Sequence, residues 1–375
     1  MIRIFNLIVL LTFTVITVKA QNPHEPNAGR QAPTNNLNIG VTQDPYFKEY
    51  LGIARKNKED KKFSKFYNRK LVVVLAEEDP QKLKYYKSSP QKLEFYRELI
   101  RINNDLLTEL IPKYWRQISS GRNNSDTILF KKYSECLELS KTNPKDYITL
   151  EFSSLRDSYN ENLFELVNKP GVDYRNTLLD KEGEFGKMEV KILEEFEKPA
   201  VYNFFTITSY PNELDFTIAI QQIGNFFMER YEFLNRSELF EQESVARREE
   251  LKNKILLVDT FQVEKRNGFS YIQEKFPATH GLTNREGLLQ IIKSKDTSYA
   301  YVIVVPYFPV FGDNSFEYTS GEKKEGDDKI SYFHLLINSE NSEILSYIRN
   351  ESRIINKKSW NRYANSFELD DSTLK

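Results

Sequence analysis

The chain has three histidines that could act as a base or a metal ligand: His24, His280 and His334. His280 is the best placed, because it lies in a predicted loop before a capped helix, whose N-terminus favours the neutral imidazole. No other histidine or cysteine lies near it, and the sequence has no His-x-x-x-His or Cys-x-x-Cys spacing. The sequence therefore assigns no catalytic residue, no cofactor site and no metal site.

The usual motifs for phosphate and acyl chemistry are missing from the sequence. The first predicted strand runs into Glu77-Glu78-Asp79 rather than into closely spaced glycines, and these carboxylates would repel a phosphate group. No Gly-x-Ser-x-Gly occurs. The two Ser-x-x-Lys matches begin at Ser89, a predicted helix cap, and at Ser320, in a charged loop. Nucleotide binding and serine-hydrolase chemistry are therefore disfavoured.

The other reactive side chains have simpler explanations. Cys136 falls on the apolar side of a predicted helix, which is typical of a buried and inert thiol. Acidic residues in the loop 312–328 could gather around calcium, but their spacing does not match an EF-hand. The aromatic strand that begins at Tyr299 could stack on a sugar or peptide, although core packing accounts better for its apolar neighbours.

The first twenty residues have the three-part pattern of a secretory signal peptide. A positive start at Arg3 precedes an apolar run over 4–18, and small residues precede a cleavage site after Ala20. A transmembrane anchor is the alternative, but the run is near the lower length limit and no basic cluster follows it. We therefore expect a secreted or periplasmic protein without a transmembrane segment after cleavage. Residues 21–45, rich in proline and asparagine, are expected to form a flexible leader.

Composition restricts the class of protein further. Removal of residues 1–20 takes away two basic residues and leaves 51 basic against 54 acidic ones, a formal charge of about −3. This balance lacks the basic domain or stripe of nucleic-acid-binding proteins, so nucleic acid is not an expected partner. The remaining 355 residues predict two domains. Cys136 is the only cysteine, so no intrachain disulfide can form, and this scarcity favours a bacterial envelope.

The first α/β domain is predicted over residues 46–240. It opens with a basic helix over 46–66, which we interpret as a solvated helix rather than as an arm for a phosphate-rich partner. Asp79-Pro80 and Ser89-Pro90 each mark a helix start. The other elements predicted here are strands at 70–76, 146–152, 201–210 and 215–221, with a turn at Pro211, and helices at 93–118 (interrupted by Pro112), 128–139, 184–197 and 226–253.

The second α/β domain is predicted over residues 250–363, followed by a frayed tail over 364–375. Its helix is expected to begin at a capping box formed by Thr283-Asn284-Arg285-Glu286. The other elements predicted here are strands at 254–258, 299–307 and 330–337, the last two forming an antiparallel hairpin, and a short helix at 343–349.

The two halves resemble each other in outline, because in each half a buried strand, a helix, a lysine-containing turn and a second strand follow in order. The first half has a longer helical insert between its two strands. The sequence thus predicts an α/β fold (α+β is the alternative) of two related mixed-sheet domains with covering helices. An internal duplication would explain the likeness.

These observations favour an exported soluble binding or interaction protein of a bacterial envelope over an enzyme. Its partner would be another envelope protein or an extracellular polymer, and nothing in the sequence fixes its oligomeric state. The alternative is an exported hydrolase whose site is assembled in the fold from carboxylates and His280. A nucleic-acid binder with a basic arm is the least favoured class.

Overall fold

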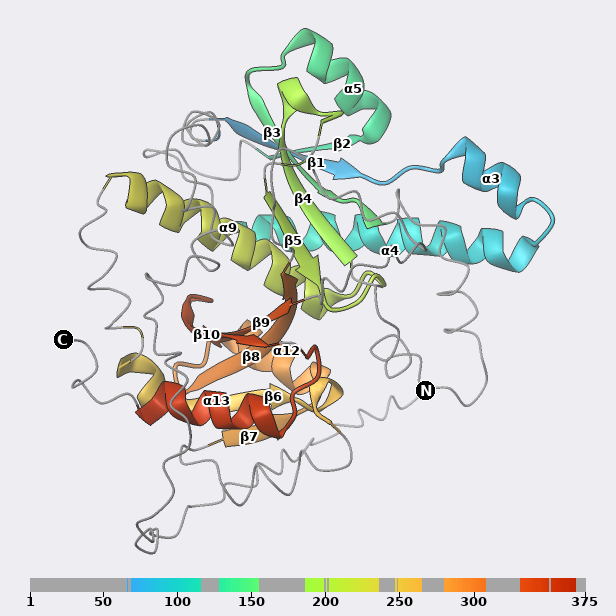
Figure 1. The fold of residues 1–375 in the computed structure, drawn as a ribbon. Coiled ribbons are helices and arrows are strands. Elements are labelled where there is room, and N and C mark those ends of the chain that lie inside the picture. Colours follow the sequence, from blue (N-terminus) through green and yellow to red (C-terminus); the bar gives the residue numbers. More distant parts are fainter. Residues whose placement is uncertain are drawn as a thin grey trace, which may run out of the picture.

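Two five-stranded mixed sheets with the same strand order form the framework of the protein (Figure 1). The computed structural model describes residues 66, 69–115, 128–154, 186–198, 200, 202–235, 247, 249–264, 280–307, 331–350 and 352–368. The first sheet has the order β2-β1-β3-β4-β5 and the second the order β7-β6-β8-β9-β10. The strands of the first sheet are β1 (Lys70–Leu75), β2 (Ile128–Lys132), β3 (Tyr147–Phe152), β4 (Gly186–Ile192) and β5 (Tyr202–Thr206). The second sheet consists of β6 (Ile255–Asp259), β7 (His280–Thr283), β8 (Tyr299–Tyr307), β9 (Ser331–Asn338) and β10 (Ile344–Asn350).

The pairing within the two sheets is also the same. β1 is parallel to β2 and β3, and β6 is parallel to β7 and β8. The last two strands of each sheet, β4 and β5 or β9 and β10, pair antiparallel. The predicted α/β class with two similar mixed-sheet domains is therefore confirmed.

The helices follow the strands in matching places. They are α3 (Pro80–Tyr86), α4 (Pro90–Tyr114), α5 (Tyr133–Thr142), α9 (Glu213–Asn235), α12 (Arg285–Ser294) and α13 (Lys357–Glu368), with short 3-10 helices at Leu193–Glu195 and Thr260–Gln262. We refer to β1 through α9 as the first unit and to β6 through α13 as the second unit. None of the helices in the described part of the chain is both long and apolar enough to cross a lipid bilayer.

Helix α9 lies between the two sheets (Figure 1). Its apolar side chains point in all directions, and Phe216, Ile220 and Ile223 belong to one hydrophobic core that includes residues of both sheets. On its second-sheet side, Gln222 Nε2 donates to the backbone oxygen of Ser342, in the β9–β10 turn, at 2.8 Å. The two units therefore share a core instead of each having a closed one. A second cluster lies between the other face of the second sheet and α13.

The spacing of elements repeats as closely as their order. The interval from the start of β2 to the start of β3, Ile128 to Tyr147, is 19 residues, and so is the interval from His280 to Tyr299. Adding 152 to the residue numbers of α5 also gives both the first and the last residue of α12. The helices that follow the last strands, α9 and α13, both begin after an asparagine whose Oδ1 accepts a backbone N–H of the first turn.

Three sequence predictions are wrong because a short apolar segment does not by itself reveal its period. Residues 184–197 were expected to be helical but contain β4, where Lys187, Glu189 and Lys191 alternate with apolar residues on the opposite face. Residues 128–132 form β2, so the helix predicted over 128–139 begins only at Tyr133. The helix predicted over 343–349 is strand β10.

A fourth prediction is wrong for a different reason. Residues 215–221, predicted as a strand, belong to α9, because Asn212 caps a helix there instead of closing a hairpin turn. The segment is buried on nearly all sides, and its apolar residues Phe216, Ile218 and Ile220 alternate with other residues as in a strand, so the sequence shows no helical period. α9 continues to Asn235, which covers the start of the helix predicted over 226–253.

Other predictions are confirmed with small shifts. The strands near 70–76, 146–152, 254–258, 299–307 and 330–337 are present, and β8 pairs with β9 as the expected hairpin. The N-cap of α12 is Asn284 rather than Thr283. Pro112 lies in the last turn of α4 and does not break it earlier. α13 continues to Glu368, into the segment predicted as a frayed tail.

Several predictions lie outside the described residues. They are the signal peptide, the leader with His24, the basic helix over 46–66 except Phe66, the acidic loop over 312–328, and the end of the tail.

Candidate functional site

The first unit carries a helical arm in a connection that is much shorter in the second unit. Residues 76–127 connect β1 to β2 and include α3 and α4, whereas the corresponding connection in the second unit spans only residues 260–279. α4 has 25 residues and is therefore about 37 Å long. Leu99, Leu107, Leu110 and Ile111 of α4 belong to the shared core, while the N-terminal end of α4 extends with α3 beyond the first sheet (Figure 1).

Hydrogen bonds attach this arm to the carboxyl end of β1. Asn104 of α4 bonds Ala76 twice, because its Oδ1 accepts from the backbone N–H and its Nδ2 donates to the backbone oxygen, both at 2.9 Å. Further out, the backbone N–H of Asp79 donates to Tyr96 Oη at 2.9 Å, and the Asp79 carboxylate caps α3 through the N–H of Gln81. The arm is thus held at several points along its length.

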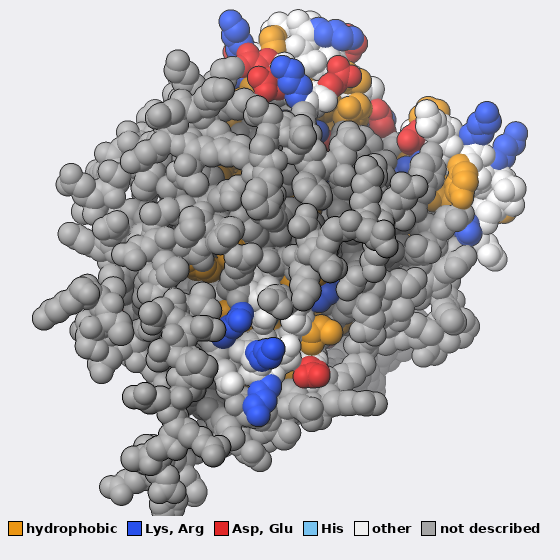
Figure 2. All heavy atoms as spheres, viewed as in Figure 1, with side chains coloured by type: hydrophobic (Ala, Val, Ile, Leu, Met, Phe, Trp, Pro, Cys, Tyr) orange, Lys and Arg blue, Asp and Glu red, His pale blue; other side chains and the backbone are white. Residues whose placement is uncertain are grey.

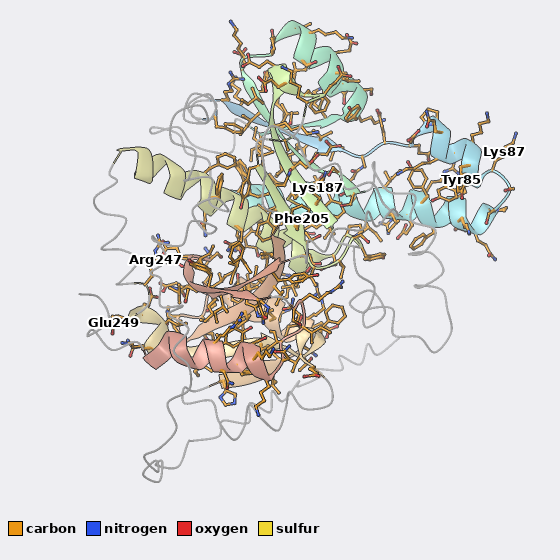
Figure 3. All side chains as sticks on the ribbon, viewed as in Figure 1. Tyr85, Lys87, Lys187, Phe205, Arg247 and Glu249 are labelled. Carbon is orange, nitrogen blue, oxygen red and sulfur yellow. The ribbon has the colours of Figure 1, made fainter. Side chains whose placement is uncertain are left out.

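Tyrosines and lysines form the tip of the arm. Tyr85 is 50% exposed, more than any other large apolar side chain among the described residues. Its ring lies edge-on to Tyr86, which is buried against Tyr96. Tyr85 and Lys87 point outward at the end of the arm (Figure 3), and in the same part of the surface blue Lys and Arg side chains lie beside orange apolar ones (Figure 2). We call α3 and the following turn, residues 80–89, the arm tip.

The arm tip is basic. It contains three lysines and no acidic residue, and Lys84 and Lys87 are exposed. The third lysine, Lys82, is 2% exposed and lies 5.6 Å from the centre of the Tyr96 ring, an attractive cation–π geometry. The nearest carboxylates along the chain are engaged elsewhere, since Asp79 caps α3 and Glu78 pairs with Arg97 at 2.9 Å.

A second candidate is the ionic cluster at the junction of the two units. Arg285, the first residue of α12, pairs with Asp215 of α9 and lies 3.6 Å from Asp259 at the end of β6. The other oxygen of Asp215 accepts from the backbone N–H and the hydroxyl of Thr208 and from Asn212 Nδ2. Both aspartate side chains are 1% exposed, so this cluster connects α9, β6 and α12 in the interior.

A third candidate is a row of charges on the first sheet. Glu189 of β4 pairs with Lys187 at 2.8 Å and with Lys191 at 3.3 Å, and Lys191 lies 3.9 Å from Glu151 of β3. Burial raises the pKa of Glu189, but the two lysines outweigh it and hold that pKa below its usual value. A carboxyl that is ionised at neutral pH cannot serve as a general acid there, so the row has the chemistry of an ion-pair network.

The structure does not place His280 beside these carboxylates. His280 is the first residue of β7, not a loop residue as predicted, and its ring lies 6.2 Å from that of Trp360. Asp259 pairs in the sheet with Thr283, three residues further along β7 and so about 10 Å away. In the described part of the chain, no group of three or more His, Cys, Asp or Glu side chains is arranged to hold a metal ion.

The other two sequence candidates are buried structural residues. His334 of β9 is fully buried, with its Nδ1 2.5 Å from Tyr363 Oη and its Nε2 2.9 Å from the backbone oxygen of Ser352. Because a carbonyl only accepts, Nε2 carries the proton and Nδ1 accepts from the tyrosine. Burial lowers the pKa of His334 to about 4 and raises the pKa of the Cys136 thiol to about 12, so neither is poised for chemistry at neutral pH.

The glutamates after β1 have a structural role as well. Glu77 accepts from both the backbone N–H and the hydroxyl of Ser134, at 3.0 Å each, in the first turn of α5. A carboxylate therefore occupies the N-terminus of α5, where its charge would repel a phosphate group.

Sequence reasoning missed the arm tip. The available signal was the segment Lys82 to Lys87, where paired tyrosines alternate with lysines between two proline-marked helix starts. The helix starts were recognised, but a sequence does not reveal whether such tyrosines are buried or exposed. No protein-family model, no curated protein and no solved structure matches this chain.

Proposed function

We propose that this protein is an exported binding protein of a bacterial envelope, and that the arm tip is its contact surface. The observation that carries the proposal is the exposed Tyr85, held at the end of an arm in a connection that is more than twice as long as its counterpart in the second unit. An insertion into a repeated framework can change without disturbing the framework, and binding residues are concentrated in such segments.

The state of the ionisable clusters supports binding rather than catalysis. Asp215 accepts three hydrogen bonds in addition to its ion pair, and His334 is bonded through both ring nitrogens. Groups bonded in this way stabilise the fold. A reaction at any of them would first have to break these contacts, which disfavours a catalytic role. The export component rests on the signal-like sequence of residues 1–20.

Retention of envelope components on the immobilised protein tests the proposal. The protein without residues 1–20 would be exposed to soluble and polymeric envelope fractions, beside Tyr85→Ala and the double variant Lys84→Gln/Lys87→Gln. We expect the unaltered protein to retain an envelope component in a saturable manner, and both variants to lose this retention. The matched control, Lys141→Gln/Lys145→Gln, removes two exposed lysines on and just after α5 and should retain as the unaltered protein does.

Two results would contradict the proposal. Equal retention by all variants would exclude the arm tip as the contact surface. Turnover of an envelope substrate without any retention would favour the hydrolase instead. Mass analysis of the natural product tests the export component separately, with a chain that begins at Gln21 as the expected result.

A further inference from the structure

The arm tip combines one exposed aromatic ring with a local excess of positive charge. Lys84 and Lys87 flank Tyr85 on the same short helix and its C-cap, and both are exposed. The whole chain has a formal charge of −1, so this positive charge is local rather than general. A partner selected by this surface therefore carries negative charge next to a flat face that can stack on a tyrosine ring.

The chemistry of the side chains separates the classes of partner. Lysine is depleted from the centres of protein–protein interfaces, whereas here lysines surround the ring directly. Single-stranded nucleic acids are bound in a basic groove with several stacking rings, whereas α3 presents one exposed ring on a helix of seven residues. A membrane surface would require a broad apolar helix face, and α3 has only seven residues.

We propose that the arm tip binds an anionic polysaccharide, with a sugar ring stacked on Tyr85 and sugar carboxylates paired with Lys84 and Lys87. This inference rests on the proposed function and names its partner class. A ring seated against another aromatic ring loses little conformational freedom on binding, which suits it to stacking. The ion pairs of the lysines with the sugar carboxylates contribute a part of the affinity that decreases as the salt concentration rises.

Titration with polygalacturonate tests the inference, with neutral dextran as the comparison ligand. We expect saturable binding to polygalacturonate that weakens as NaCl is raised from about 50 to about 200 mM, and no binding to dextran. Tyr85→Ala should weaken binding roughly tenfold and Tyr85→Phe should restore it, because stacking needs the ring and not the hydroxyl. Lys84→Gln/Lys87→Gln should weaken it about fivefold, and Lys141→Gln/Lys145→Gln should not change it.

Unchanged circular dichroism and thermal midpoints would show that the variants are folded. The inference is overturned if polygalacturonate does not bind, if Tyr85→Ala binds as tightly as the unaltered protein, or if polyphosphate, an oligonucleotide or anionic vesicles bind with equal affinity and the same dependence on Tyr85. If polygalacturonate fails while the arm variants still lose envelope retention, only the partner class is wrong. If those variants lose no retention, the proposed contact surface itself is wrong.

Discussion

The two units share strand order, pairing and spacing, yet the equivalent faces of their sheets differ in chemistry. In the first sheet this face carries Thr149 and Glu151 of β3 opposite Lys191 and Glu189 of β4. The corresponding pairs in the second sheet are Tyr301 with Ile337 and Ile303 with Leu335. These four residues belong to the shared core, in which α9 and α12 also take part. Two sheets of the same topology can therefore carry different side chains on equivalent faces, according to the elements that pack against each face.

The helices that cover this face differ in the same way. Cys136 of α5 and Leu288 of α12 occupy equivalent positions, and both are buried. A cysteine in the place of a leucine is acting as a small apolar residue, which agrees with its inert thiol. The two equivalent positions are thus both buried, while the size of the side chain differs with the space that the surrounding residues leave.

The largest expected effect concerns the junction cluster, which has no ionic counterpart in the first unit, where Tyr133 and Val74 occupy the positions of Arg285 and Asp259. Replacing Arg285 by methionine removes the ion pair with Asp215 and the nearby cation from Asp259, both of which are buried. We expect a loss of about 4 kcal/mol in the free energy of unfolding, measured by urea denaturation at neutral pH.

The control for this prediction is Lys293→Met, which breaks the half-exposed ion pair with Glu213 on the same two helices. It should cost less than about 1 kcal/mol. If Arg285→Met cost no more than this control, the cluster would not hold the two units together.

The second prediction concerns His334, which stands where the first unit has Met188. Its pKa is about 4 in the folded protein and about 6.5 when unfolded, so the unfolded chain binds more protons between these values. The contribution to stability is complete above pH 6.5 and is lost as the pH falls to about 4, amounting to about 3 kcal/mol. Urea denaturation across this range measures it.

The matched variant is His334→Met/Tyr363→Phe, which removes the histidine and its buried partner together. Its stability should fall by about 3 kcal/mol less than that of the unaltered protein over the same pH range. Equal losses would mean that other groups cause the acid sensitivity.

The sequence revealed the strongly apolar strands and the proline-marked helix starts because their signals are local. β1, β6 and β8 are continuous apolar runs, and Asp79 caps α3 as its position before a proline suggests. The repeat of a buried strand, a helix and a second strand in each half could be recognised for the same reason, since each step spans few residues.

The missed elements depend on contacts with distant parts of the chain. Residues 215–221 of α9 are buried on nearly every side, in a core that contains residues of both sheets, so no one-sided apolar period marks them as helix. The junction cluster joins Asp215 to Arg285, 70 residues away, and no spacing rule connects these residues. The arm tip was missed because the exposure of Tyr85 depends on how far the N-terminal end of α4 extends beyond the sheet.

A smaller effect should separate the two sheet faces. Thr149 is fully buried and its Oγ1 has no hydrogen-bond partner, whereas the equivalent Tyr301 lies in the shared core. Thr149→Val keeps the shape and removes the unpaired hydroxyl, so we expect a gain of about 1 kcal/mol in urea denaturation. Thr206→Val is the opposing control, because Thr206 Oγ1 donates to the backbone oxygen of Thr208 at 2.7 Å, and its loss should destabilise. Destabilisation by Thr149→Val would show that its hydroxyl is bonded after all.

The smallest expected effect distinguishes the ends of the two equivalent helices. Lys295, the C-cap of α12, has a φ of 53°, in the left-handed region, whereas Asn143, the C-cap of α5, has a φ of −134°. Lys295→Gly relieves the strain of the left-handed backbone and should raise the free energy of unfolding by about 0.5 kcal/mol. Asn143→Gly should lower it by a similar amount, because glycine there only adds freedom to the unfolded chain. Both side chains are exposed, so changes of the same sign would show that the backbone conformation is not the cause.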